Sequence, residues 1–351
     1  MLATQSRLSL IIVFSILSLQ YSAQQFSSIY SKIDSVMHQD SPIKFNGNIL
    51  ITKGKQNLYQ SSFGVQNFNT KTALKNTNRF EVMSITKQLT AVMMLKAVED
   101  SKLNLEDSIS KYLPDLKMAW KDSVKVYQLL NHTHGIVKLD QKLAYPAGSE
   151  FRYGNLSFAL AGQILEQIYK KPYAEQATTF LKSLGFKNPE IFTNNSGLSN
   201  VKGHLINNEK IEVLEKSGIR PDFAAADGWL ASTSELSFWN QLLYSGKILK
   251  NKSLQEFLKG KALSQHDVFG KEKQPYGYGI RVVNEQNIKY YGHTGLGDGF
   301  SALNIYIPKY DLSLVILENQ MPENSDYYYN IETKIKNLLI DFLSKNPNPK
   351  F

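Results

Sequence analysis

The chain has 351 residues, a formal net charge of +9 at pH 7 and no cysteine. Without cysteine it forms no disulfide, has no thiol nucleophile and carries no lipid on an N-terminal cysteine. Its 40 lysine and arginine residues are scattered, whereas a nucleic-acid-binding surface needs basic residues clustered among aromatic ones. We therefore expect no nucleic-acid partner.

The first 23 residues have the pattern of a secretory signal peptide. Arg7 precedes an apolar run over 8–17, and small residues follow at Ser22 and Ala23. The apolar run is too short to span a bilayer, so cleavage is expected rather than anchoring. Removing these 23 residues from 351 would leave a mature chain of 328 residues with no membrane span. We expect it in the periplasm or outside the cell.

A helix and two strands are expected at the start of the mature chain. The helix covers residues 26–38, and the strands, 46–52 and 57–64, are joined near Gly54 and Lys55. A helix beginning at Ser84 follows. From about residue 100 to 270 the apolar spacing is mostly helical. The clearest helical segments are 124–131, 156–169, 173–183 and 235–244.

Strand character returns in the last quarter of the chain, and a helix over about 328–343 follows it. The expected strands are 276–284, 288–291, 300–306 and 312–317. Because short polar turns separate them, the sheet should be antiparallel. The expected fold class is α+β, with an antiparallel sheet built from both chain ends, flanking helices and an inserted, mostly helical lobe.

We expect one domain over residues 24–345, followed by a short tail over 346–351. Its sheet lobe would comprise about 24–83 and 275–345, and its helical lobe about 84–274.

The most informative motif is Ser84-Ile85-Thr86-Lys87, which places a hydroxyl and an amine about one helical turn apart. Three other serine–lysine pairs share the spacing, but only Ser84 lies between an apolar lead and an apolar, helically spaced run. Lysine activates a serine when it is neutral part of the time, and burial or nearby positive charge lowers its pKa. The other pairs are Ser41/Lys44, Ser108/Lys111 and Ser199/Lys202.

Two further motifs follow: Tyr153-Gly154-Asn155 before an expected helix, and His293-Thr294-Gly295 at the end of an expected strand. Each alone has an ordinary structural explanation. In this order after the serine–lysine pair, they make the chain resemble the penicillin-recognising serine hydrolases. The similar branch holds class C β-lactamases, D-alanyl-D-alanine carboxypeptidases and related esterases.

Two supporting segments, 129–135 and 276–279, also resemble this superfamily, and the resemblance covers about residues 26–345. It implies an antiparallel sheet flanked by helices, plus a helical region, in agreement with the organisation expected from the residue pattern.

The resemblance assigns a role to each motif residue. Ser84 would form an acyl-enzyme, Lys87 would be its base, and Tyr153 would relay protons to the leaving group. Asn155 would hold Lys87 and could bind the amide of the substrate. Thr294 would bind a carboxylate or carbonyl of the substrate.

The oxyanion hole would come from the backbone N–H groups of Ser84 and Leu296, just after Gly295. His293 leaves two alternatives open. A charged imidazole would favour a phenolate on Tyr153, whereas a neutral one would mainly donate or accept a hydrogen bond.

Arg281 is a further candidate, because a guanidinium can bind a terminal carboxylate with two parallel hydrogen bonds. The alternative is an ordinary exposed strand arginine. The β-lactamases of this superfamily usually have lysine where this chain has His293, which favours a carboxypeptidase or esterase over a dedicated resistance enzyme. His134 and residues 227–229 also depart from the usual smaller residues.

A metal site is not expected. His132 and His134 could place two imidazoles together, but a catalytic metal normally has three protein ligands and no third is evident nearby. We expect no cofactor.

The sequence thus predicts a secreted serine hydrolase that acts on a D-alanyl peptide, a β-lactam or a small ester. The partner would be a small-molecule or peptide substrate, including peptides derived from peptidoglycan, and the oligomeric state stays open. The alternative is a catalytically idle relative that binds cell-wall fragments or a partner protein. Retention of the Ser84 and Lys87 pair with Tyr153 and Asn155 favours the enzyme.

Overall fold

The computed structural model describes residues 28–40, 43–193, 201–207 and 210–349. The expected signal peptide over residues 1–23 lies outside these ranges, as do Ser41 and Ser199. Within the described part of the chain, no helix is long and apolar enough to cross a membrane.

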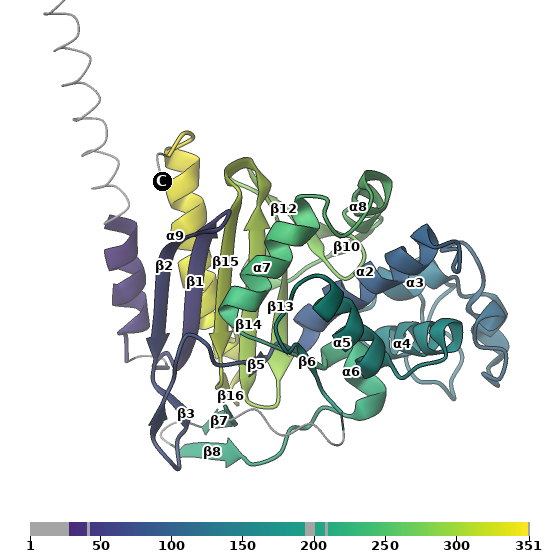
Figure 1. The fold of residues 1–351 in the computed structure, drawn as a ribbon, viewed down its shortest axis with the longest axis horizontal. Coiled ribbons are helices and arrows are strands. Elements are labelled where there is room, and N and C mark those ends of the chain that lie inside the picture. Colours follow the sequence, from purple (N-terminus) through teal and green to yellow (C-terminus); the bar gives the residue numbers. More distant parts are fainter. Residues whose placement is uncertain (1–27, 41–42, 194–200, 208–209, 350–351) are drawn as a thin grey trace, which may run out of the picture.

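An eight-stranded antiparallel sheet forms the centre of the molecule, in the order β10-β11-β12-β13-β14-β15-β1-β2. The N-terminal strand β1 pairs with the late strand β15 along its whole length (Figure 1). This pairing confirms a sheet built from both chain ends. The strands are β1 Gly47–Lys53, β2 Gln56–Phe63, β10 Ala262–Ser264, β11 Gln274–Tyr276, β12 Arg281–Glu285, β13 Ile288–Gly297, β14 Phe300–Ile307 and β15 Leu312–Glu318.

Helices cover both faces of the sheet. Successive side chains of a strand point to opposite sides, and the buried strands carry apolar side chains on both sides, so each face needs a covering layer. On β15, Leu314 and Ile316 join a core with the helix over 28–37 and α9 (Asn330–Lys345). Val315 and Leu317 join the core of the opposite face, where α7 (Thr233–Tyr244) packs. Figure 1 shows α7 in front of the sheet and α9 behind it.

The helical lobe lies beside the sheet and is organised around α2 (Thr86–Glu99) (Figure 1). The expected apolar run at helical spacing accounts for one face of α2, but 11 of its 14 residues are buried, polar ones included. The reason is that α2 contacts helices of the lobe on several sides. These are α4 Asn155–Tyr169, α5 Tyr173–Ser183, α6 Ala224–Asp227 and α8 Asn251–Phe257, while α3 Val126–Leu130 packs on α4.

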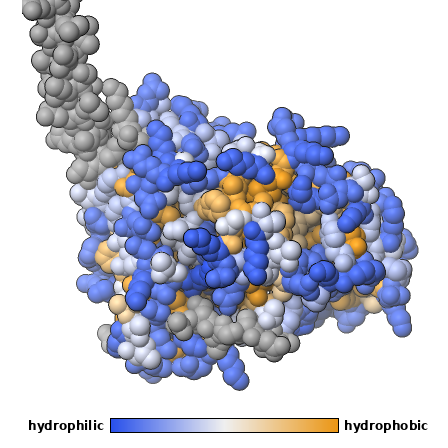
Figure 2. All heavy atoms as spheres, viewed as in Figure 1, coloured by the Kyte–Doolittle hydropathy of each residue, from blue (hydrophilic) through white to orange (hydrophobic). Residues whose placement is uncertain are grey.

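Short strands complete the lobe and the lower edge of the molecule. They form the small sheets β5-β9-β6, β16-β7-β8 and β3-β4. Their bounds are β3 Val65–Asn67, β4 Thr72–Ala73, β5 Phe80–Glu81, β6 Glu190–Ile191, β7 Gly203–Asn207, β8 Lys210–Leu214, β9 Trp229–Ala231 and β16 Met321–Pro322. Hydrophilic side chains cover most of the face in Figure 2, with hydrophobic ones gathered near its middle.

Two expected strands have different bounds in the structure. The segment 276–284 is not one strand, because a turn at 277–280 separates β11 from β12. Gly279 has φ 67° within this turn, and a Cβ there would lie 2.7 Å from the backbone oxygen of Lys87. The glycine thus lets the turn approach α2. The expected strand 288–291 continues to Gly297, so His293 and Thr294 lie within β13.

Candidate active site

Ser84 lies in a short 3₁₀ turn, Met83–Ile85, immediately before α2. Met83 has φ 47°, a left-handed conformation that costs a non-glycine residue about 1–3 kcal/mol. Strand β13 packs against the turn at Gly295, where a Cβ would lie 2.2 Å from the backbone oxygen of Val82. The glycine therefore brings the backbone of β13 beside the serine.

The structure brings Lys87 and Ser84 together as expected. Lys87 is fully buried, and its Nζ donates to Ser84 Oγ at 2.8 Å and to Asn155 Oδ1 at 2.9 Å. A third bond runs to the backbone oxygen of Ala226 at 3.2 Å. The half-buried serine thus has an amine in direct contact, held in place by groups from α4 and α6.

Asp227 contacts this pair as well, although sequence reasoning gave it no role. Ser84 Oγ donates to its Oδ1 at 3.2 Å, and Lys87 Nζ lies 3.3 Å from the same oxygen. Its Oδ2 accepts from Asn155 Nδ2 at 2.6 Å. The carboxylate therefore contacts Ser84, Lys87 and Asn155. The only sequence signal was an acidic residue where the superfamily prefers small ones.

Tyr153 lies in the loop before α4, as predicted, with 37% of its surface exposed. Its ring centroid is 5.2 Å from Lys87 Nζ and 4.4 Å from the ring of His132. His132 is buried, and burial together with the charge of Lys87 and other cations lowers its pKa well below 6.5. A neutral imidazole thus packs against the tyrosine.

His293 is buried and neutral. Its Nδ1 lies 2.6 Å from the backbone oxygen of Thr294 and its Nε2 3.0 Å from the Tyr276 hydroxyl. Because a carbonyl only accepts, the proton is on Nδ1 and Nε2 accepts from Tyr276. Burial, with the charges of Arg281 and Lys87, lowers the pKa of His293 well below 6.5. Of the two alternatives, the geometry supports the neutral, hydrogen-bonding imidazole.

Thr294 and His266 face each other across the sheet side of the site. Thr294 Oγ1 lies 3.1 Å from His266 Nε2. Burial and the charge of Arg281 lower the pKa of His266 to about 3, so its imidazole is neutral. Sequence reasoning missed His266, because no motif surrounds it and its partner lies 28 residues away.

Arg281 is 4% exposed, so the alternative of an exposed strand arginine is wrong. Its guanidinium carbon lies 5.9 Å from the ring centroid of Tyr153, 5.2 Å from that of Phe269 and 5.3 Å from that of Tyr276. Among the described residues, its Nε and Nη1 have no hydrogen-bond partner. A buried charge normally has a partner, so this guanidinium suits an anionic ligand.

A cleft of about 330 Å³ opens beside this constellation, on the side of Leu296. Asn155, Asp227, Leu296, Gly297 and Asp298 are among its lining residues. It therefore reaches Asn155 and Asp227, which bond to Lys87, and the end of β13.

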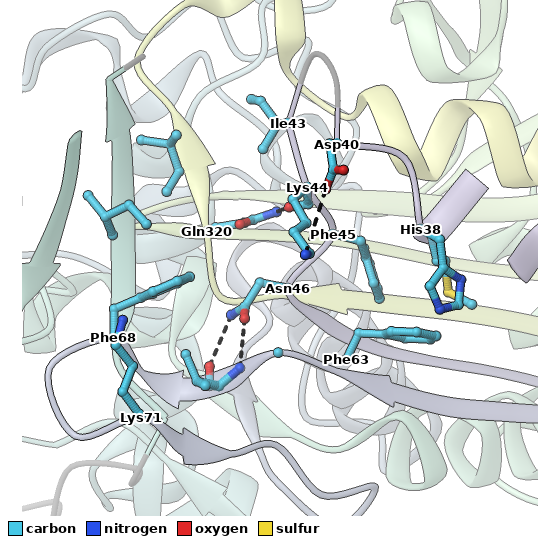
Figure 3. A pocket seen from close by; sticks show the side chains of 15 residues that line it. His38, Asp40, Ile43, Lys44, Phe45, Asn46, Phe63, Phe68, Lys71 and Gln320 are labelled. Carbon is cyan, nitrogen blue, oxygen red and sulfur yellow. Dashed lines mark hydrogen bonds and ion pairs between the residues drawn. The ribbon is translucent and has the colours of Figure 1, made fainter. Parts of the chain in front are cut away.

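A larger cavity of about 580 Å³ lies at the β2 edge of the sheet (Figure 3). Phe45, Phe63 and Phe68 line it, together with Asp40 and Lys44, whose ion pair is 3.6 Å long. Figure 3 shows Asn46 at its floor, bonded to the backbone of Val65. None of the catalytic candidates lines this cavity, so its size does not make it the active site.

The two histidines of the 129–135 segment, His132 and His134, contact other groups of the protein. His134 Nδ1 accepts from the backbone N–H of Ile136 at 2.8 Å, and its ring centroid is 6.2 Å from that of His132. Across the described ranges, no group of three or more His, Asp or Glu residues is placed to hold a metal ion.

A buried lysine bonded to a serine at the start of a helix, beside an antiparallel sheet, is an arrangement that fits a serine hydrolase. The Beta-lactamase family model matches residues 46–335, and the chain belongs to this family.

Among curated relatives, the chain is 25% identical over 327 residues to a β-lactamase of Providencia stuartii, covering 81% of this chain and 85% of that protein. It is 24% identical over 311 residues to Protein flp of Staphylococcus aureus strain MW2, covering 80% of this chain. The chain spans about 60% of the length of that relative.

Solved structures with the same fold include an octameric penicillin-binding protein homologue from Pyrococcus abyssi. It has a TM-score of 0.74 and 22% identity, covering 90% of this chain and 77% of that one. The D-amino acid amidase of Ochrobactrum anthropi SV3 has a TM-score of 0.76 and 16% identity, covering 91% and 99%. These likenesses confirm the predicted fold.

Proposed function

We propose that this protein hydrolyses an amide or ester through an acyl-enzyme on Ser84. The observation that carries the proposal is the 2.8 Å contact between Ser84 Oγ and the fully buried Nζ of Lys87. Such a contact gives a serine the adjacent base that a nucleophilic hydroxyl requires. Tyr153, over Lys87, is the proposed proton relay to the leaving group.

The chemistry proceeds in two balanced steps. Ser84 Oγ bonds to the carbonyl carbon, the bond to the leaving nitrogen or oxygen breaks, and the serine proton passes through Lys87 and Tyr153 to the leaving group. Water then bonds to the acyl carbon, the ester bond to Ser84 breaks, and a proton returns to the serine. Backbone N–H groups of Ser84 and Leu296 would stabilise the oxyanion. Removing one such donor typically lowers the rate by about 100- to 1,000-fold.

We further propose that the preferred substrate carries a carboxylate on its leaving group, as a D-alanyl peptide does. Arg281, with its unpartnered guanidinium nitrogens, and Thr294 support this choice. The amidase of similar fold was solved with D-phenylalanine, which also supports a D-amino acid derivative. β-Lactams and small esters present a carbonyl to the same serine and are the alternative substrates.

Export through the signal-like residues 1–23 belongs to the same proposal, because peptidoglycan-derived peptides lie outside the cytoplasm. The apolar run over 8–17 after Arg7 supports it.

The test is intact-protein mass spectrometry after incubation with a fluorescent penicillin and, separately, with a fluorophosphonate. We expect a single adduct on the wild type and none on Ser84→Ala. Hydrolysis of 4-nitrophenyl acetate above the Ser84→Ala background would separate an enzyme from an idle binding relative. Equal labelling of the two proteins, or no labelling of the wild type, would overturn the proposal.

A further inference from the structure

Asp227, the last residue of α6, is held in place by the packing of α6 on α2. Before it in the chain, the backbone oxygen of Ala225 accepts from Thr90 Oγ1 at 2.6 Å. After it, the backbone N–H of Trp229 donates to Thr86 Oγ1 at 3.0 Å. These two bonds fix the backbone on both sides of Asp227, so its carboxylate is presented to the start of α2.

The hydrogen bonds of Lys87 use all three hydrogens of an ammonium group. Nζ donates to Ser84 Oγ at 2.8 Å and to Asn155 Oδ1 at 2.9 Å. It also donates to the backbone oxygen of Ala226 at 3.2 Å. A neutral amine has only two hydrogens, so Lys87 is charged in this arrangement and has no lone pair. It must lose a proton before it can take one from Ser84.

The hydroxyl hydrogen of Ser84 is directed to Asp227 in this arrangement. Ser84 Oγ accepts from Lys87, and its own hydrogen is donated to Asp227 Oδ1 at 3.2 Å. The same carboxylate oxygen lies 3.3 Å from Lys87 Nζ. One oxygen of Asp227 therefore contacts both groups that have to lose a proton before Ser84 can attack a carbonyl.

We propose that Asp227 is a further catalytic residue, which accepts the proton that Lys87 must lose to become the base. An N–H bond of Lys87 breaks and an O–H bond forms at Asp227 Oδ1, so the charged pair becomes a neutral pair. Ser84 then donates its hydrogen to the lone pair of Lys87 as Oγ bonds to the carbonyl carbon. This inference rests on the proposed function and adds a residue to its mechanism.

The protons balance over the cycle. Lys87 passes the serine proton to the leaving group through Tyr153, as proposed above, and is neutral again. When the products leave, Asp227 returns its proton to Lys87, and the charged pair of the free enzyme is restored.

Substrate binding favours the first proton transfer. The side chain of Lys87 is fully buried, whereas that of Asp227 keeps 14% of its surface exposed and lines the cleft beside Leu296. A substrate in this cleft removes the remaining water from the carboxylate. Loss of water disfavours charged groups, so it shifts the pair toward its neutral form. The base is therefore generated when the substrate is in place.

The test measures the rate of Ser84 labelling by a fluorophosphonate, together with kcat and KM for 4-nitrophenyl acetate. The variants are Asp227→Asn, which keeps the size and an acceptor oxygen, and Asp227→Gly, which leaves space for a small carboxylate. The matched control is Asp222→Asn, in the turn before α6, where the carboxylate pairs at the surface with Arg220. Each protein is assayed with sodium formate and with sodium chloride at equal ionic strength.

We expect Asp227→Asn to lower the labelling rate and kcat about 100-fold with little change in KM, as for the loss of a positioned acid–base group. The loss should shrink between pH 7 and pH 9, because solvent then removes the proton of Lys87. Asp227→Gly should be equally slow, and formate should raise its rate at least tenfold over chloride. Asp222→Asn should match the wild type.

Two failures are distinguishable. If the fluorophosphonate does not label Ser84 of the wild type, the proposed function itself fails. If the wild type is labelled but Asp227→Asn is as fast or faster, the carboxylate only balances the charge of Lys87, and its catalytic role is overturned. The same conclusion follows if formate raises the rate of Asp227→Gly no more than chloride does.

Discussion

Two buried cations lie near Ser84, the proposed nucleophile, and differ in what surrounds them. Lys87 contacts Ser84, Asn155, Asp227 and a backbone carbonyl, so its charge is balanced inside the protein. Arg281 lies among aromatic rings, with two of its nitrogens unpartnered within the described structure. From this comparison we infer that Lys87 interacts with Ser84 during the reaction, whereas the guanidinium of Arg281 forms its missing hydrogen bonds with a ligand.

A third buried cation supplies a reference for both. Lys336 on α9 is 1% exposed and donates to both carboxylate oxygens of Glu285, at 2.9 and 2.6 Å. Burial lowers its pKa, which the carboxylate partly offsets. This pair ties α9 to β12 and lies outside the proposed site, so its role should be purely structural.

The largest effect is expected when Lys87, whose charge is balanced inside the protein, is removed. Lys87→Ala should slow acylation by about 100- to 10,000-fold, because Ser84 loses its general base. Stopped-time labelling with the fluorescent penicillin measures this rate. Lys96→Ala, on the same helix but paired with Glu99 at 2.7 Å, is the control. A loss below tenfold for Lys87→Ala would assign proton removal to another group.

Replacing Lys336 should have the opposite result, with a loss of stability and no loss of activity. Lys336→Met leaves Glu285 without its cationic partner, with only the Tyr290 hydroxyl bonded to it, and should reduce the free energy of unfolding by about 3 kcal/mol. Activity per folded molecule should not change. Urea unfolding measures the loss, and Lys345→Met, which breaks an exposed pair with Asp341, should cost less than about 1 kcal/mol. Equal losses for the two variants would mean that the buried Lys336–Glu285 pair contributes no more to the free energy of unfolding than an exposed pair.

Arg281 should affect substrate use more than stability. Arg281→Met should lower kcat/KM about 10- to 100-fold for a D-alanyl peptide with a free carboxylate, because charge-assisted hydrogen bonds are lost. The corresponding peptide amide should change less than threefold. The melting temperature should hold or rise, since among the described residues no carboxylate is paired with Arg281. A drop in stability with equal loss on both substrates would show that Arg281 is structural.

The sequence was sufficient for the features that depend on local pattern. Apolar periodicity located the strands of both chain ends, although it merged β11 with β12. The order of three motifs identified Ser84, Lys87 and Asn155, which the structure brings into contact.

Features that depend on packing between distant segments could not be read from the pattern. His266 reaches Thr294, and Asp227 reaches Ser84 from 143 residues away. The neutral state of His293 follows from burial beside Arg281 and Lys87, which only the fold creates. The spacing of apolar residues in α2 likewise gave no sign that helices of the lobe would also bury its polar residues.

The last prediction concerns the buried neutral His134 and the pH dependence of stability. Burial, with the charge of Arg152, lowers the pKa of His134 to about 4, whereas the unfolded chain has a value near 6.5. Between pH 6.5 and 4 the unfolded state binds more protons at this residue. The stability contributed by His134 is therefore fully present above pH 6.5 and is lost as the pH falls through this window.

Lowering the pH from 7 to 5 should thus cost about 2 kcal/mol at His134, an order-of-magnitude figure from the linkage of pKa to stability. Protonation would also displace the Ile136 N–H that Nδ1 accepts. His134→Ser, which restores the residue common in the superfamily, should flatten the pH dependence of urea unfolding by this amount. His38→Ser, at an exposed position, is the control. Parallel curves for wild type and His134→Ser would mean that His134 takes up its proton without opening the fold.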